Sequence, residues 1–168
     1  RRVLFRSHLL GGIKMEQEYQ NILVGIDGSE QALLAFKKAV EVARRNRGTV
    51  YVVNVIDQQF YNFMGYAPID QTVVDQQTEA AKQMIEDCKA YGKTVDYQDI
   101  EGIIAYGSVR ETMAINLPKK YKIDLIMVGQ SGLNAVERFM TGSVASYVIR
   151  RAPCDVLIVS DEEEVAKE

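Results

Sequence analysis

Five short apolar segments recur along the chain, and each has the length of a β-strand. Most are rich in β-branched residues, which favour strands over helices. Four of them are apolar at consecutive positions, a pattern typical of parallel strands that are buried on both faces. We therefore predict strands at 21–26, 49–56, 95–104, 125–128 and 154–159. The third segment carries interspersed polar residues and is expected at a sheet edge; these residues are Asp96, Gln98, Asp99 and Glu101.

Between these segments, apolar side chains recur three and four positions apart, which is the spacing of one helix face. This pattern predicts four helices, at 30–46, 74–91, 108–118 and 143–151. Ser29 is suited to cap the first helix, and Gly48 is suited to stop it. We expect Gly92 to close the second helix and Pro118 to end the third.

The alternation of strands and helices predicts the fold class. It indicates parallel pairing, right-handed crossovers and helices on both faces of one open, doubly wound α/β sheet. A length of 168 residues suits a single domain. We assign this domain to 15–160, with an acidic tail at 161–168 and a non-native or disordered extension at 1–14, whose apolar parts are too short for a signal peptide.

One segment, 57–73, interrupts the regular pattern with a glycine, a proline and four aromatic residues. A loop of this length in a compact domain usually has a role of its own. It is compatible with a lid over a ligand, with a surface that faces a partner, and with an aromatic loop that simply packs on the domain.

The composition narrows the possible chemistry. The two cysteines, Cys88 and Cys154, lie far apart and form no CxxC pair, and the only histidine is His8. These residues argue against a zinc site, a disulfide framework and histidine-based catalysis. Cys88 falls on the apolar stripe of its predicted helix, so we expect a buried thiol and not a reactive one.

The charge distribution argues against nucleic acid as a partner. The net charge is −3, but residues 1–14 supply four basic side chains and no acidic one. The remaining chain carries 16 basic and 23 acidic side chains, which gives a net charge of −7. An acidic body offers no electrostatic footprint for nucleic acid. No apolar run is long enough to span a membrane, and we expect a cytoplasmic protein.

A glycine-rich segment joins the fourth predicted strand to the fourth predicted helix. Gly129 ends the strand, Gly132 follows, and Gly142 directly precedes Ser143 and Val144, where the helix begins. The free N–H groups of a helix start attract anions, and glycine lets the backbone approach a phosphate closely. The segment therefore predicts a phosphate-binding loop. The same residues are also compatible with ordinary turns, a helix stop and a serine cap.

A second candidate follows the first strand, where Asp27 precedes Gly28 and Ser29. Open parallel sheets bind ligands beyond the carboxyl ends of their strands, at the point where the strand order reverses. If the first and fourth strands are neighbours, Asp27 lies beside the phosphate-binding loop, where it can meet a ribose hydroxyl or a metal held by phosphate oxygens. The alternative is an aspartate that only stabilises its own turn.

Four stretches of the sequence resemble the universal stress protein family. They are VGIDGS at 24–29, NVID at 54–57, the pattern Gly129-x2-Gly132-x9-Gly142-Ser143, and APCDVLIV at 152–159. The resemblance covers 21–160, essentially the whole domain. The glycine spacing with a final serine is similar to the ATP-binding branch of the family, as opposed to the branch that lacks these glycines.

This resemblance implies a five-stranded sheet of order 3-2-1-4-5, a homodimer and a bound adenine nucleotide, which is ATP, ADP or AMP. Asp27 would contact the ribose or a nucleotide-bound Mg²⁺ or Mn²⁺, and Val55 would hold adenine through its backbone. The phosphates would be surrounded by Gly129, Gly132, Gly142, Ser143 and Val144. The apolar strand at 154–159 would form the dimer contact, because an uncovered edge of that kind is a pairing hazard.

We therefore expect a nucleotide-binding regulatory or stress-response module with an unknown protein partner. The sequence provides no catalytic histidine and no general base beyond Asp27, so ATP hydrolysis is expected to be slow at most. One alternative is a dimeric interaction module that binds no nucleotide. Another is an ATP-using adenylating enzyme, although the glycine signatures of such enzymes and the P-loop lysine motif are missing from the sequence.

Overall fold

The computed structural model describes residues 18–57, 71–130 and 143–160. Its centre is a sheet of five parallel strands in the order β3-β2-β1-β4-β5. The strands are β1 (Asn21–Gly25), β2 (Thr49–Ile56), β3 (Ile100–Tyr106), β4 (Leu125–Gly129) and β5 (Asp155–Val159). The predicted fold class, strand order and edge position of β3 are confirmed.

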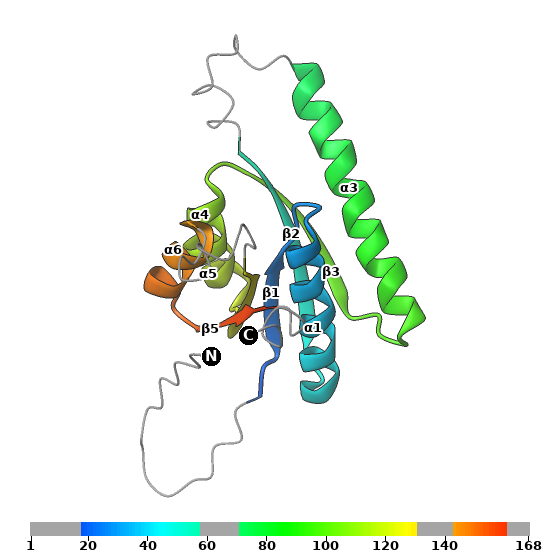
Figure 1. Ribbon diagram of the computed structural model, residues 1–168, viewed down its shortest axis with the longest axis vertical. Coiled ribbons are helices and arrows are strands. Elements are labelled where there is room, and N and C mark those ends of the chain that lie inside the picture. The colour runs from blue at the N-terminus through cyan, green and yellow to red at the C-terminus, as the bar shows by residue number, and fades with distance from the viewer. Residues whose placement is uncertain (1–17, 58–70, 131–142, 161–168) are drawn as a thin grey trace, which may run out of the picture.

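Helices cover both faces of the sheet (Figure 1). One face carries α1 (Glu30–Asn46) and α3 (Gln71–Thr94), and the other carries α6 (Ser143–Arg151) and a continuous helical stretch. That stretch consists of α4 (Val109–Glu111), the π-helical turn η1 (Thr112–Asn116) and α5 (Leu117–Tyr121). Counted this way, the described ranges contain the four predicted helices. None of these helices is long and apolar enough to cross a bilayer.

The core consists of two apolar layers, one on each face of the sheet. Ile22 and Val24 of β1 pack in the layer that contains Phe36 of α1. Leu23, which lies between them, packs in the opposite layer with Met113 of η1. All three β1 side chains have an exposed fraction of 0%. Burial on both faces explains why the strand is apolar at the consecutive positions 22–24.

The end of α1 differs from the prediction that Gly48 stops it. The residue in the left-handed conformation is Arg47, with φ of 54°, and its N–H bonds to the Ala43 carbonyl. Gly48 follows, and its N–H also bonds to the Ala43 carbonyl at 3.0 Å, but its missing side chain serves the packing. A Cβ atom at Gly48 would lie 2.5 Å from the Tyr19 carbonyl oxygen, so the glycine allows the chain before β1 to pass close by.

The prediction that Gly92 closes the second helix is wrong, because α3 continues to Thr94. Gly92 is buried inside this helix, and a Cβ atom there would lie 2.5 Å from both Ile100 Cδ1 and the Tyr97 carbonyl oxygen. Residues 95–99 then form a turn in which Asp96 has φ of 56°. This turn delays the start of β3 to Ile100, five residues after the predicted start.

Pro118 does not end the third helix, as the sequence predicted, but lies within the helical stretch. The Leu117 N–H bonds to the Thr112 carbonyl five residues back, which is a π-type bond. A proline ring normally clashes with the carbonyl four residues earlier, and the wider π turn relieves this contact. The stretch ends at Tyr121, and Lys122 follows with φ of 52°.

Candidate ligand-binding site at the carboxyl ends of the strands

The strand order reverses between β1 and β4, which are direct neighbours. Their register pairs Val24 with Met127, so the segments that follow the two strands start side by side. From the sequence, the proximity of Asp27 and Gly129 depended on the assumption that these two strands are neighbours, and the structure shows that they are. Asp27 and Gly129 thus lie at the point where ligands bind in open parallel sheets.

Asp27 forms the turn between β1 and α1. Its Oδ1 atom accepts a hydrogen bond from the Ser29 N–H at 2.9 Å, and Gly28 has φ of 85°. Ser29 caps α1, because its Oγ accepts from the Ala32 N–H at 3.2 Å. Asp27 is therefore a turn-forming aspartate, one of the two predicted alternatives. Its side chain is exposed, and its Oδ2 atom has no hydrogen bond to any part of the chain that the structure describes.

Gly129 allows two elements to approach closely. A Cβ atom at this position would lie 2.4 Å from the Gln31 carbonyl oxygen in the first turn of α1. The following N–H, from Gln130, bonds to the Val159 carbonyl at 2.8 Å. Packing alone therefore requires a glycine here. The same close contact brings the start of α1 to the end of β4.

Ser143 and Val144 are the first two residues of α6. Ser143 is exposed, and Val144 is half-buried against the core layer that contains Leu23. Gly132 and Gly142 lie outside the described residues. The phosphate-binding role of this segment therefore stays a prediction.

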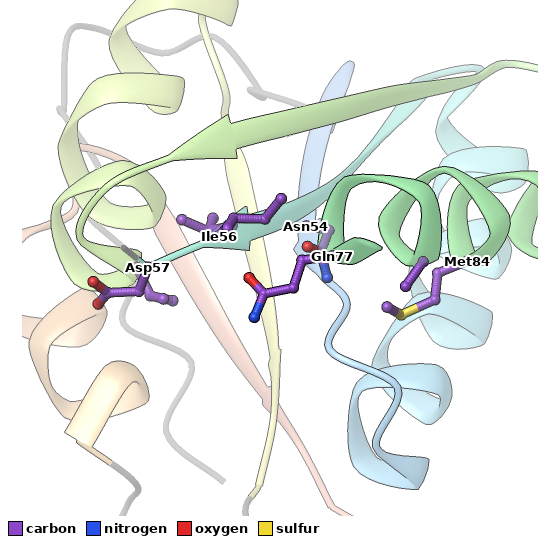
Figure 2. A pocket seen from close by; sticks show the side chains of 8 residues that line it. Asn54, Ile56, Asp57, Gln77 and Met84 are labelled. Atoms are coloured by element: carbon purple, nitrogen blue, oxygen red, sulfur yellow. The ribbon is translucent and has the colours of Figure 1, made fainter. Parts of the chain in front are cut away.

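A pocket of about 370 Å³ opens at the carboxyl end of β2. Figure 2 shows Asn54, Ile56 and Asp57 at the end of this strand, with Gln77 and Met84 of α3 nearby. Among the described residues, the lining consists of Asn54, Val55, Ile56, Asp57, Gln77, Ala80, Met84 and Val109. Val55, the residue predicted to hold adenine, is thus part of the wall.

The backbone of Val55 faces the side of the sheet where β1 has already ended. The Ile26 N–H bonds to the Val53 carbonyl at 2.8 Å, so odd-numbered β2 residues present their polar backbone groups toward β1. The Gly107 N–H bonds to the Ile56 carbonyl at 3.0 Å, so even-numbered ones face β3. Within the described residues, neither the N–H nor the carbonyl of Val55 has a partner on the β1 side. This leaves one donor and one acceptor at the pocket.

The sequence analysis missed Asn54, Gln77 and Met84. Asn54 donates from its side-chain amide to the Ile26 carbonyl at 2.8 Å. The sequence does distinguish Asn54, because it is the one side-chain amide in the otherwise apolar or hydroxyl-bearing segment 49–56. Gln77 and Met84 lie seven positions apart on α3, so two turns of one helix face contribute to the pocket. Nothing in their residue types distinguishes them from other positions of that helix.

A group of residues with shifted pKa values lies at the amino ends of β1, β4 and β5 and supports the fold. Burial raises the pKa of Asp124, which accepts from the N–H groups of Gln20 and Asn21 at 2.8 and 3.1 Å. Burial and a hydrogen bond to Asp155 raise the pKa of Tyr19 to about 12. These contacts hold the start of β1 against β4 and β5.

The described residues contain no group of three His, Cys, Asp or Glu side chains that could hold a metal ion. Asp27 has one carboxylate oxygen available, which fits a single ligand to a metal that is carried by a phosphate. A metal held by protein ligands alone would need more donors than this edge of the described structure provides.

The fold is that of a doubly wound α/β protein, with a pocket at the carboxyl end of β2. The model of the universal stress protein family matches residues 18–160. A protein of Staphylococcus aureus (strain USA300) that is named for this family is 40% identical over 145 residues, which is 86% of each chain. The chain therefore belongs to the universal stress protein family.

Two solved structures are similar to the chain over nearly their whole length. The universal stress protein UspA from Lactobacillus plantarum has a TM-score of 0.70 and 29% identity, over 86% of this chain and 99% of that one. A universal stress protein in complex with cAMP has a TM-score of 0.62 and 26% identity, over 85% of this chain and 98% of that one.

Proposed function

We propose that this protein binds an adenine nucleotide, with ATP as the expected ligand, and acts as a regulatory or stress-response module in the cytoplasm. The observation that carries the proposal is the N–H and carbonyl of Val55 at the pocket on β2, which have no hydrogen-bond partner among the described residues. A backbone N–H beside a carbonyl matches the edge of adenine, where a ring nitrogen accepts and the neighbouring amino group donates. The pocket volume of about 370 Å³ lies in the usual range for small-ligand sites.

The comparisons support this choice of ligand. A structural relative with 26% identity is in complex with cAMP, which carries the same base. In our proposal, the adenine lies against Val55 and the ribose reaches Asp27 across the end of β1. The phosphates then lie over the segment formed by Gly129, Gly132, Gly142, Ser143 and Val144, with Mg²⁺ or Mn²⁺ carried by their oxygens.

Hydrolysis is proposed to be slow at most. Asp27 is the nearest candidate general base, but its Oδ1 atom is engaged by the Ser29 N–H. A carboxylate held in a turn is poorly placed to follow an attacking water toward a phosphorus atom. Occupancy by nucleotide, and not turnover, would then report the state of the cell to a protein partner.

Mass spectrometry of the small molecules released from purified, denatured protein tests the proposal. Recovery of an adenine nucleotide in near-stoichiometric amount is the expected result. An empty site, together with no binding of added ATP, would favour a dimeric interaction module without nucleotide. Multiple-turnover formation of an adenylated product would favour an ATP-using enzyme.

A further inference from the structure

The β1–β2 ladder stops one hydrogen bond early. The ladder bond from Ile26 N–H to the Val53 carbonyl is present at 2.8 Å. In a parallel ladder the next bond would run from the Val55 N–H to the Ile26 carbonyl. That bond is not formed, and the Ile26 carbonyl accepts from Asn54 Nδ2 at 2.8 Å instead.

Asn54 thus occupies the acceptor that the Val55 N–H would otherwise use. A buried or half-buried carbonyl needs a donor, and the side-chain amide supplies one from the neighbouring residue. Ile26 is buried, with an exposed fraction of 7% for the residue as a whole, and Asn54 lines the same pocket as Val55. This replacement of one donor by another explains how β2, in the middle of the sheet, ends with an N–H that has no partner in the described part of the chain.

We propose that Asn54 is a positioning residue for ligand binding. Its amide satisfies the Ile26 carbonyl and thereby keeps the Val55 N–H available for the ring nitrogen of a flat heteroaromatic base. This inference rests on the proposed adenine site, but the positional effect on Val55 can be measured without any nucleotide. It also gives a role to Asn54, the one side-chain amide within the otherwise apolar or hydroxyl-bearing strand β2.

Asn54→Val removes the donor and keeps a side chain suited to a strand. The Ile26 carbonyl then becomes available, and we expect the Val55 N–H to bond to it. Amide hydrogen exchange measured by NMR on the nucleotide-free protein should show the Val55 amide exchanging at least about tenfold more slowly than in the parent. Isothermal titration should show ATP binding about tenfold more weakly, the value of one hydrogen bond.

Asn21→Val is a matched control. Asn21 is also an asparagine at a strand position, and its Nδ2 donates to the Lys122 carbonyl at 3.2 Å. It lies at the amino end of β1, whereas the pocket lies at the carboxyl end of β2. We expect this variant to leave both the Val55 exchange rate and the ATP affinity unchanged. A merely structural role for Asn54 would make the two variants behave alike.

The outcomes separate this inference from the proposed function. Slower Val55 exchange in Asn54→Val, in a protein that binds no ATP, would support the positioning role and reject the nucleotide. Unchanged Val55 exchange in a folded Asn54→Val protein would overturn the positioning role. Unchanged ATP affinity in that variant, with the parent binding ATP, would overturn it as well.

Discussion

At the scale of single residues, Gly129 shows how packing and binding requirements can coincide. The sequence marked this glycine as part of a phosphate-binding segment, and the structure gives it a steric reason, because a Cβ atom would lie 2.4 Å from the Gln31 carbonyl oxygen. A backbone atom cannot move aside as a flexible side chain can. The glycine therefore stabilises the fold, whatever ligand is bound.

Gly129→Ala should lower the free energy of unfolding by about 1–3 kcal/mol, because the methyl group forces α1 away from β4. Urea unfolding followed by circular dichroism measures this change. Gly25→Ala is the control, since a Cβ atom there would meet only the end of a flexible side chain, that of Met113, at 3.2 Å. Equal losses for the two variants would show that the contact with Gln31 is not the cause.

The two cysteines allow a prediction about pH. Burial raises the pKa of Cys88 to about 11 and that of Cys154 to about 12, from an ordinary value near 9. Thiolate is the reactive form, so at pH 8 the folded protein should react with iodoacetamide more slowly than the unfolded protein, by about a hundredfold at Cys88 and about a thousandfold at Cys154. Mass spectrometry of the labelled chains measures the rates. Ordinary reactivity in the folded state would contradict the buried placement of Cys88 or the half-buried placement of Cys154.

The same shifts predict the sign of a stability change. The unfolded thiols lose their protons near pH 9, whereas the folded thiols keep theirs until about pH 11 and 12. Between these values the folded state holds more protons, so stability decreases as the pH rises.

At the scale of elements, Tyr97 links the turn before β3 to the turn before β2. Its side chain has an exposed fraction of 6%, and its hydroxyl donates to the Gly48 carbonyl at 2.6 Å. Tyr97→Phe leaves that carbonyl without its donor and should cost about 1–3 kcal/mol of unfolding free energy, measured in urea.

Tyr91→Phe serves as the control for this prediction. Tyr91 packs edge-on against Phe36 with ring centroids 5.7 Å apart, and its hydroxyl has no hydrogen bond to the described part of the chain. Removal of that hydroxyl should change the stability by less than about 0.5 kcal/mol. A Tyr97 variant that is as stable as the Tyr91 variant would show that the Gly48 contact contributes little.

Four strands were predictable from sequence because they are apolar at consecutive positions, and β2 has the predicted bounds, 49–56. The polar-interspersed edge strand β3 starts five residues after its predicted start. The helix ends were less predictable. Gly48 and Gly92 looked like helix stops, but their missing Cβ atoms make room for other segments of the chain. Pro118 looked like a helix terminus, but the π turn before it accommodates its ring. Local residue preferences cannot reveal such contacts, which depend on what packs nearby.

The candidate site was predictable only in part. Val55 could be placed by its motif, because strand ends in this fold form the ligand edge. Gln77 and Met84 could not, since only the path of α3 across the sheet brings them to the pocket. The bond between Asn54 and the Ile26 carbonyl also depends on where β1 diverges from β2, which no local pattern encodes.

At the scale of the whole molecule, β5 is an edge strand with an apolar sequence. Leu157 packs against the core and Val159 is buried, so a lysine at either position would disturb the fold itself. Ile158 is half-buried and belongs to neither of the two core layers. This makes Ile158 the cleaner position at which to test the proposed homodimer.

Ile158→Lys should convert the dimer to a monomer in sedimentation experiments, because a charge on the edge strand opposes pairing. Val73→Lys is the control, since Val73 is also apolar and exposed, at 38%, but lies on α3. A dimer that survives the change at Ile158 would place the contact elsewhere. A monomeric parent would reject the homodimer.

Isothermal titration with ATP is the most direct test of nucleotide binding, the central claim. We predict that the parent binds one nucleotide per chain and that Ser143→Ala binds about ten- to a hundredfold more weakly, since it loses one charge-assisted hydrogen bond. Gly142→Val should show no binding while circular dichroism shows an intact fold, because a side chain there would enter the space needed by the phosphates. A parent that gives no binding, or a folded Gly142→Val protein that binds as tightly as the parent, would contradict this account.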